Sequence, residues 1–175
     1  MRNLVNDNLQ ATVEFLDGLT SKIIEATRNI DSHANVLIGI STGIMLLSVN
    51  EVFQVDHLKL TFAVVAMFSA FSVFIALLAI RLPKVLINKK HKESLFYART
   101  IAAFPSAKEY AKTLRKTLED EDDFFEQYSL EIYNLSKYYY IPKRGLLSWS
   151  RYVFIFGVIA GMLFLMLEKL HWFKY

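Results

Sequence analysis

Three apolar stretches interrupt an otherwise polar chain: Ala34 to Val49, Leu60 to Ile80 and Tyr152 to Leu167. A helix needs about 20 apolar residues, at about 1.5 Å of rise each, to cross the hydrocarbon core of a bilayer. The second stretch meets this length without a charged residue, whereas the other two must recruit flanking residues or thin the bilayer. Buried helices of a soluble domain would carry a polar face, which these stretches lack. The pattern predicts an all-α membrane protein with three transmembrane helices.

The basic residues set the expected orientation. The segment from Arg81 to Arg151 holds 14 of the 20 Lys and Arg residues, whereas the loop from Asn50 to His57 holds none. Because basic residues stay on the cytoplasmic side, we expect the N-terminus and this long segment inside and the C-terminus outside. The predicted protein is therefore a multi-pass membrane protein.

The same reasoning divides the chain into five segments. We expect a cytosolic amphipathic helix over 1–33, continuous with a first span over 34–53. A second span at 58–82, a cytosolic helical insert at 83–150 and a third span at 151–170 complete the chain.

The first segment carries a stripe of mostly apolar residues spaced by three and four, which is typical of helices that pack along one face. Its members are Leu9, Thr12, Leu16, Leu19, Ile23, Ala26 and Ile30. We expect one helix from about Asn6 to Asn50. Two interpretations of the stripe stay open, one in which it packs on its own cytosolic part and one in which it forms a seam between protomers.

The insert has helix start and stop signals. Ser106 and Glu109 have the spacing of a capping box, which predicts a helix start. A second stripe, from Phe125 to Tyr139, predicts another helix, and we expect Pro142 to end it. The acidic run from Glu119 to Asp123 lies between the two helices and favours a solvated turn over a metal site, because nothing fixes its carboxylates around an ion.

Small residues four apart occur in every span, and such pairs let helix backbones approach closely in lipid. They are Gly39 and Gly43, Ala66 and Ala70, and Gly157 and Gly161. These pairs could pack the three spans together or join copies of the chain, and we expect a homo-oligomer. The hydroxyl residues Ser41, Thr42 and Ser48 of the first span are weak candidates for a pore lining, since such groups also bond to their own helix.

Nothing in the chain points to catalysis. There is no cysteine, which excludes a thiolate nucleophile and a cysteine metal site, and the four histidines are scattered. No phosphate-binding glycine loop or zinc-protease motif is present. We therefore expect no enzyme, no metal and no cofactor.

Several short motifs together resemble the Pycsar transmembrane effector family. They are Asp31 to Asn35 at the start of the first span, Leu95 to Tyr97, Ser106 to Tyr110, Gln127 to Ser136, and Lys143 before the last span. The resemblance covers about Asp31 to Tyr152. Leu95 to Tyr97 could be a short extended piece or the end of a preceding helix.

This resemblance implies a role in bacterial defence against phage. Members act downstream of a nucleotide-making enzyme, and the nucleotide is expected to make the membrane bundle leak, which arrests the infected cell. A Hailong-type effector is a related possibility, a channel controlled by an oligonucleotide from a partner nucleotidyltransferase. A neighbouring cyclase gene would indicate the first family and a nucleotidyltransferase gene the second.

A nucleotide ligand needs cations for its phosphate and an aromatic surface for its base. The candidates for ligand binding are Arg99, Arg115, Lys116, Lys143 and Arg144, with Tyr97 or Tyr110 for stacking. For Lys143, Arg144 and Arg151, anchoring the third span at anionic lipid headgroups is the competing role. A membrane-anchored structural or adaptor protein without a pore is the alternative function, since it would share the same topology.

Overall fold

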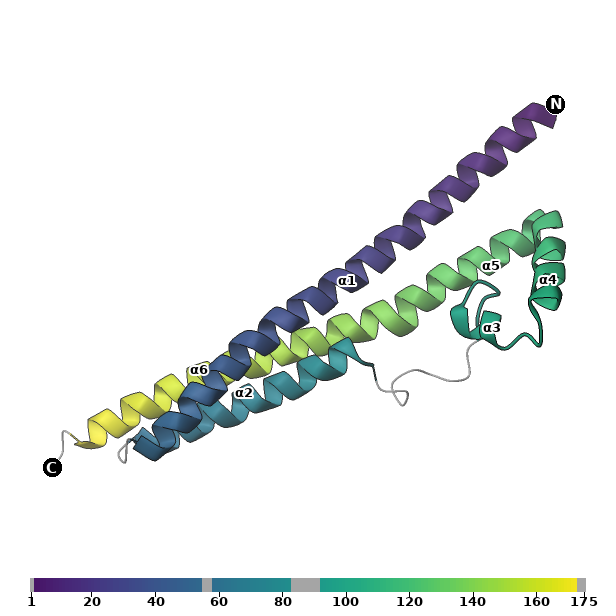
Figure 1. The fold of residues 1–175 in the computed structure, drawn as a ribbon. Coiled ribbons are helices and arrows are strands. Elements are labelled where there is room, and N and C mark those ends of the chain that lie inside the picture. Colours follow the sequence, from purple (N-terminus) through teal and green to yellow (C-terminus); the bar gives the residue numbers. More distant parts are fainter. Residues whose placement is uncertain (1, 55–57, 83–91, 173–175) are drawn as a thin grey trace. The chain divides into compact units, whose positions relative to one another are not determined.

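The computed structural model describes residues 2–54, 58–82 and 92–172, and in these residues the regular structure is entirely helical (Figure 1). The α-helices are α1 (Arg2–Gln54), α2 (Lys59–Ile80), α3 (Ala98–Ala102), α4 (Ala107–Glu119), α5 (Glu121–Asn134) and α6 (Ile141–Trp172). Three helical stretches, one in each predicted span region, are long and apolar enough to cross a membrane. The predicted all-α fold with three spanning helices is thereby confirmed.

The chain forms two compact units. The membrane bundle consists of Arg28–Pro83 and Pro142–Tyr175, and the polar unit consists of Met1–Thr27 and Lys84–Ile141. Helix α1 therefore contributes its first half to the polar unit and its second half to the bundle.

Helix α1 runs without a break over 53 residues, as the sequence indicates, and extends beyond both expected ends. On its predicted stripe, Leu16 and Ile30 are buried, and Leu19, Ile23 and Ala26 are half-buried. Because this burial occurs within a single chain, these positions favour intrachain packing over a seam between protomers.

Small side chains make up the buried face of α2. Its buried residues are Thr61, Ala66, Ser69, Ser72, Ala76 and Ala79. They recur at intervals of three to five residues and so form one continuous stripe along the helix. No side chain on this stripe is larger than threonine, which lets neighbouring backbones come close.

The glycines of α6 meet larger side chains of α2. A Cβ atom at Gly157 would collide with the Cβ of Phe68, and one at Gly161 with a methyl group of Val65. This glycine pair therefore packs within the chain. In contrast, a Cβ at Gly39 or Gly43 would meet no atom within 4 Å.

The helix boundaries of the polar unit follow their capping residues. Ser106 accepts a hydrogen bond from the backbone N–H of Glu109 at 3.2 Å, and α4 begins at the next residue, as predicted. Asp120 caps α5 by accepting from the N–H groups of Asp122 and Asp123 at 3.1 and 3.2 Å. The acidic run was predicted to be a turn, but only Asp120 lies outside the helices, because Glu119 ends α4 and Glu121, Asp122 and Asp123 form the first turn of α5.

The prediction that Pro142 ends the helix is wrong. A π-helix at Leu135–Tyr140 joins α5 to α6, so the chain remains helical through the proline. The backbone N–H of Ile141 bonds to the carbonyl of Ser136, five residues back. Proline lacks an N–H and its ring collides with the carbonyl four residues earlier, and the wider π turn relieves both problems.

The segment from Leu95 to Tyr97 is not the end of a preceding helix in the described residues. Leu95 and Phe96 lie in a turn, and Tyr97 has extended backbone angles immediately before α3.

The close contact of α6 with α2 can be tested by exchanging side-chain volume between Gly161 and Val65. Gly161→Ala should destabilise the bundle by about 1–3 kcal/mol, because the added methyl overpacks against Val65. The double variant Gly161→Ala with Val65→Ala should recover most of this loss, since the Val65 Cβ at 3.8 Å and the Thr61 carbonyl at 3.9 Å are ordinary contacts. Thermal unfolding in detergent measures both.

Gly145→Ala is the matched control on the same helix, because its new methyl meets nothing within 4 Å. It should be neutral or stabilising, since alanine is the better helix former. Equal losses for Gly161→Ala and Gly145→Ala would contradict the packing argument.

Candidate functional site

Two candidate ligand residues, Tyr97 and Arg99, follow a segment that is hydrogen-bonded to helix α5 of the polar unit. The backbone N–H of Leu95 donates to the side chain of Gln127 at 2.9 Å, and the Asn134 amide donates to the Lys92 carbonyl at 3.0 Å. Ser94 is buried and donates to the carboxylate of Glu131. These bonds fix the chain that leads to Tyr97 and Arg99.

Tyr97 is bonded to another tyrosine. Its hydroxyl forms a hydrogen bond with that of Tyr139, and the two rings lie 6.1 Å apart. Burial, together with this bond, raises the pKa of Tyr139 well above its ordinary value. The Tyr139 phenol therefore stays neutral at physiological pH, and Tyr97 is held against it by the hydrogen bond.

Arg99 lies on the surface of the same unit. Its guanidinium is 3.7 Å from the carboxylate of Glu93, and its side chain is 72% exposed. The Glu93 side chain is only 22% exposed. The exposed Arg99 guanidinium is therefore accessible to another anion while it neutralises a mostly buried carboxylate.

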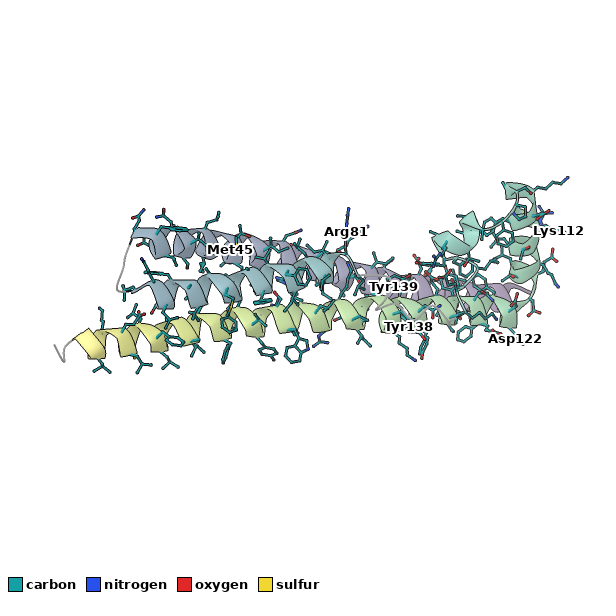
Figure 2. The ribbon with its side chains drawn as sticks, turned by 90° about the horizontal axis from the view of Figure 1, so that it is seen from below. Met45, Arg81, Lys112, Asp122, Tyr138 and Tyr139 are labelled. Atoms are coloured by element: carbon teal, nitrogen blue, oxygen red, sulfur yellow. The ribbon has the colours of Figure 1, made fainter. Side chains whose placement is uncertain are left out.

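A cationic groove runs along α4, the helix that carries Lys112 (Figure 2). Its volume is about 600 Å³, which is within the range of small-molecule sites. The lining residues are Ser106, Lys108, Glu109, Ala111, Lys112 and Arg115.

Three of these residues, Lys108, Lys112 and Arg115, are spaced by four and three, so their charges lie on one side of the helix. Arg115 was a candidate from the sequence, whereas Lys108 and Lys112 were missed. Their helical spacing relative to Arg115 was the signal that could have found them.

The other α4 candidates lie outside the groove lining. Tyr110 is half-buried and packs edge-on against Phe104, with ring centres 5.3 Å apart. Lys116 is exposed in the last turn of α4. The structure therefore brings only Arg115, of the predicted ligand residues, to this groove.

Lys143 belongs to the membrane bundle and has a partner there. Its ammonium lies 2.6 and 2.9 Å from the two carboxylate oxygens of Asp31, and its side chain is only 12% exposed. This pair ties the start of α6 to α1. Its neighbour Arg144 is exposed. Lys143 is therefore bound to Asp31, whereas Arg144 is accessible from outside the bundle.

A cluster of three serines joins all three helices of the bundle. Ser72 of α2 donates to the Ser150 carbonyl at 3.1 Å, and the Ser150 hydroxyl donates to the Ser72 carbonyl at 2.7 Å. Ser41 of α1 lies 3.4 Å from the Ser72 hydroxyl. All three side chains are fully buried.

Of the three hydroxyl residues predicted to line a pore, Ser41 belongs to this serine cluster. Ser41 is enclosed between helices, and Thr42 is half-buried. Ser48 is buried and lines a mostly apolar cavity of about 250 Å³, together with Thr61, Gly161 and neighbouring apolar residues of the three helices. Near that cavity, Thr61 donates to the carboxylate of Glu168 at 2.6 Å.

These features define an integral membrane protein that combines a three-helix bundle with a helical unit bearing a cationic groove. The chain matches the Pycsar effector protein domain over residues 15–168, and it belongs to that family. It is therefore a membrane effector of defence against phage, and its family implies a cyclic nucleotide signal from a partner cyclase.

The match confirms the resemblance seen in the short motifs. Comparison with curated proteins and with solved structures gives no match.

The Asp31–Lys143 pair can be tested by a double-mutant cycle with Asp31→Asn and Lys143→Met. We expect a coupling of about 1–3 kcal/mol, as for hydrogen bonds to charged groups that are partly withdrawn from water. Chemical unfolding in detergent measures it. The cycle with Arg144→Met in place of Lys143→Met is the control and should show no coupling; equal coupling in both cycles would exclude a specific pair.

Proposed function

We propose that the chain is a nucleotide-controlled channel of the inner membrane, with its N-terminus inside and its C-terminus outside. A cyclic mononucleotide binds the polar unit and shifts the membrane bundle from a closed to an open state. Ion flux then depolarises the infected cell and stops its growth. The chain itself catalyses no reaction.

The observation that carries this proposal is the small, hydroxyl-rich interior of the bundle. Its largest fully buried side chains include Ser41, Ser69, Ser72 and Ser150. Hydrogen bonds between membrane helices contribute only about 0.6 kcal/mol on average. A ligand that couples to the bundle with about 1–3 kcal/mol, the usual range for allosteric coupling, is therefore strong enough to exchange these contacts.

The groove along α4 is the proposed ligand site. Lys108, Lys112 and Arg115 supply up to three cations for the single phosphate of a cyclic mononucleotide, and charge-assisted bonds to phosphate are the strong ones. The groove of about 600 Å³ also has room for the nucleoside. Arg99 remains a second candidate because its side chain is exposed.

A conducting path is proposed to form between copies of the chain. Within one bundle, the hydroxyls of Ser41, Ser72 and Ser150 are enclosed by packed helices and bonded to one another. On α1, however, the Gly39 and Gly43 face is exposed and unobstructed. A glycine pair of this spacing is the usual contact for a second membrane helix.

The proposed ligand site can be tested by comparing nucleotide affinity after substitution of cations inside and outside the groove. Lys112→Gln or Arg115→Gln should weaken cyclic mononucleotide binding about tenfold or more, because each removes a charged hydrogen bond to phosphate. Lys116→Gln, on the same helix but outside the groove, should have little effect. Titration of the detergent-purified protein with a panel of cyclic mononucleotides measures the affinities.

Ion flux from liposomes tests the channel itself. The cognate nucleotide should release a trapped ion from liposomes containing the wild-type protein, and the Lys112→Gln and Arg115→Gln variants should need correspondingly more nucleotide. Nucleotide binding without flux would favour a membrane-anchored adaptor, and no binding at all would refute the proposed control.

The assembly prediction separates the two glycine pairs. Gly39→Leu and Gly43→Leu should reduce the detergent-solubilised assembly to a smaller species while the monomer stays folded, because their side chains enter open space. Light scattering after size exclusion measures the mass, and thermal unfolding shows whether the fold persists. An unchanged mass in the double variant would exclude this face as the contact between copies.

A further inference from the structure

A polar stripe crosses the exposed side of α6 near the Asp31–Lys143 end of the bundle. Arg144, Ser148 and Arg151 are spaced by four and three residues and therefore lie on one face of the helix. Both arginines are exposed, and Ser148 is half-buried between them. Neither arginine is in an ion pair with any described residue of the chain, so both guanidinium charges are available to an external anion.

Contacts within the bundle give the depth of this stripe. Arg144 follows Lys143, which is paired with Asp31, and Arg151 follows Ser150, which is bonded to Ser72. At about 1.5 Å of rise per residue the stripe covers about 10 Å of helix. Ser72 lies eight residues before Ile80, the last residue of α2, so Arg151 lies about 12 Å below that helix end.

The flank formed by α2 is apolar over the same depth. Phe74 and Leu77, between Ser72 and the end of α2, are 60% and 50% exposed. Their side chains require hydrocarbon around them. The α2 flank of the bundle therefore needs lipid tails, whereas the α6 flank presents two guanidinium groups at the same depth. A guanidinium in hydrocarbon is costly without an anion.

The residues beside the stripe also suit a lipid headgroup. Trp149 and Tyr152 are both about two-thirds exposed, and these amphipathic rings favour the headgroup level of a bilayer. Side chains of a helix tilt toward its N-terminus, which directs Arg151 toward Arg144 and the Asp31–Lys143 end. The next turn presents the exposed, apolar Ile155, where an acyl chain can lie.

We propose that the Arg144–Ser148–Arg151 stripe is a binding site for an anionic phospholipid, whose phosphate is drawn along α6 to the depth of the serine cluster. The two guanidinium groups bind phosphate oxygens, Ser148 donates a further hydrogen bond, and an acyl chain follows Ile155. The bilayer is consequently thinner on the α6 flank than on the α2 flank. This site is independent of the nucleotide control proposed above.

Quenching of a tryptophan placed one turn beyond the stripe tests the site in a bilayer. The reporter chain carries Trp149→Phe, Trp172→Phe and Ile155→Trp, which leaves one tryptophan, since the chain has two. It is reconstituted in phosphatidylcholine vesicles that contain phosphatidylglycerol, with bromine on the acyl chains of one lipid or the other. Brominated phosphatidylglycerol should show the higher relative binding constant at this position.

Arg144→Gln and Arg151→Gln should each lower that preference about fivefold, as expected for a basic residue at an anionic membrane surface. Arg151→Lys should retain part of it. The control is Arg81→Gln, because Arg81 is an exposed cation at the end of α2 that points away from α6 (Figure 2). Quenching by brominated phosphatidylcholine that stays as strong as in the unmodified reporter, or becomes stronger, shows that each variant is still inserted.

Three results would overturn the proposal. Equal quenching by both lipids means that the stripe has no preference for an anionic headgroup. Loss of preference in Arg81→Gln equal to that in Arg151→Gln means that only the net charge matters. Weak quenching by both lipids means that protein, rather than lipid, covers this face.

Discussion

The narrow, small-residue face of α2 is the constraint on which the bundle depends. Because this face carries only alanine, serine and threonine, the other two helices can come within hydrogen-bond distance of it. Lipid tails are as apolar as leucine, so helices in a membrane gain little from burying large apolar groups against one another. Close approach, which maximises dispersion contacts and brings hydroxyl groups together, takes the place of a hydrophobic core.

Polar contacts at three depths then fix the register of the helices. The Asp31–Lys143 pair joins α1 to α6, the serine cluster joins all three helices, and the Thr61–Glu168 bond joins α2 to α6. Each hydroxyl contact is weak on its own. Sliding one helix past another by a turn would nevertheless break several of them together, so their combined effect is to select one alignment. Large α2 residues opposite glycines of α6 reinforce that alignment, since Phe68 and Val65 fit only where no Cβ is present.

Local features of the fold could be predicted from the sequence, and non-local ones could not. Continuous apolar stretches identify the spans, and Ser106 illustrates how a capping residue marks a helix start. Pro142 misled the prediction because a proline ends an α-helix but is accommodated by a π turn, and the sequence pattern carries no sign of the π turn.

The candidate site shows the same limit. Lys143 looked like a ligand or headgroup contact, yet its partner Asp31 is 112 residues away, and no periodicity relates them. The two glycine pairs look equivalent in sequence, but only the pair in α6 meets a neighbouring helix of its own chain. Lys108 and Lys112, in contrast, were within reach of a helical-spacing argument that began from Arg115.

The connections between the two units bear on how a ligand signal could reach the membrane. Only two stretches of described chain cross from one unit to the other, at Thr27–Arg28 inside α1 and at Ile141–Pro142. The first lies in a helix of 53 residues that is free of proline and so resists bending. The second directly follows the π-helix, where Lys137 donates to the Tyr133 hydroxyl one turn earlier.

A π turn holds one more residue than an α turn, and Pro142 prevents its simple conversion to α-helix, because the Tyr138 carbonyl would then lack its N–H partner. Residues 135–140 therefore keep their π turn at the point where the chain passes from the polar unit to the bundle.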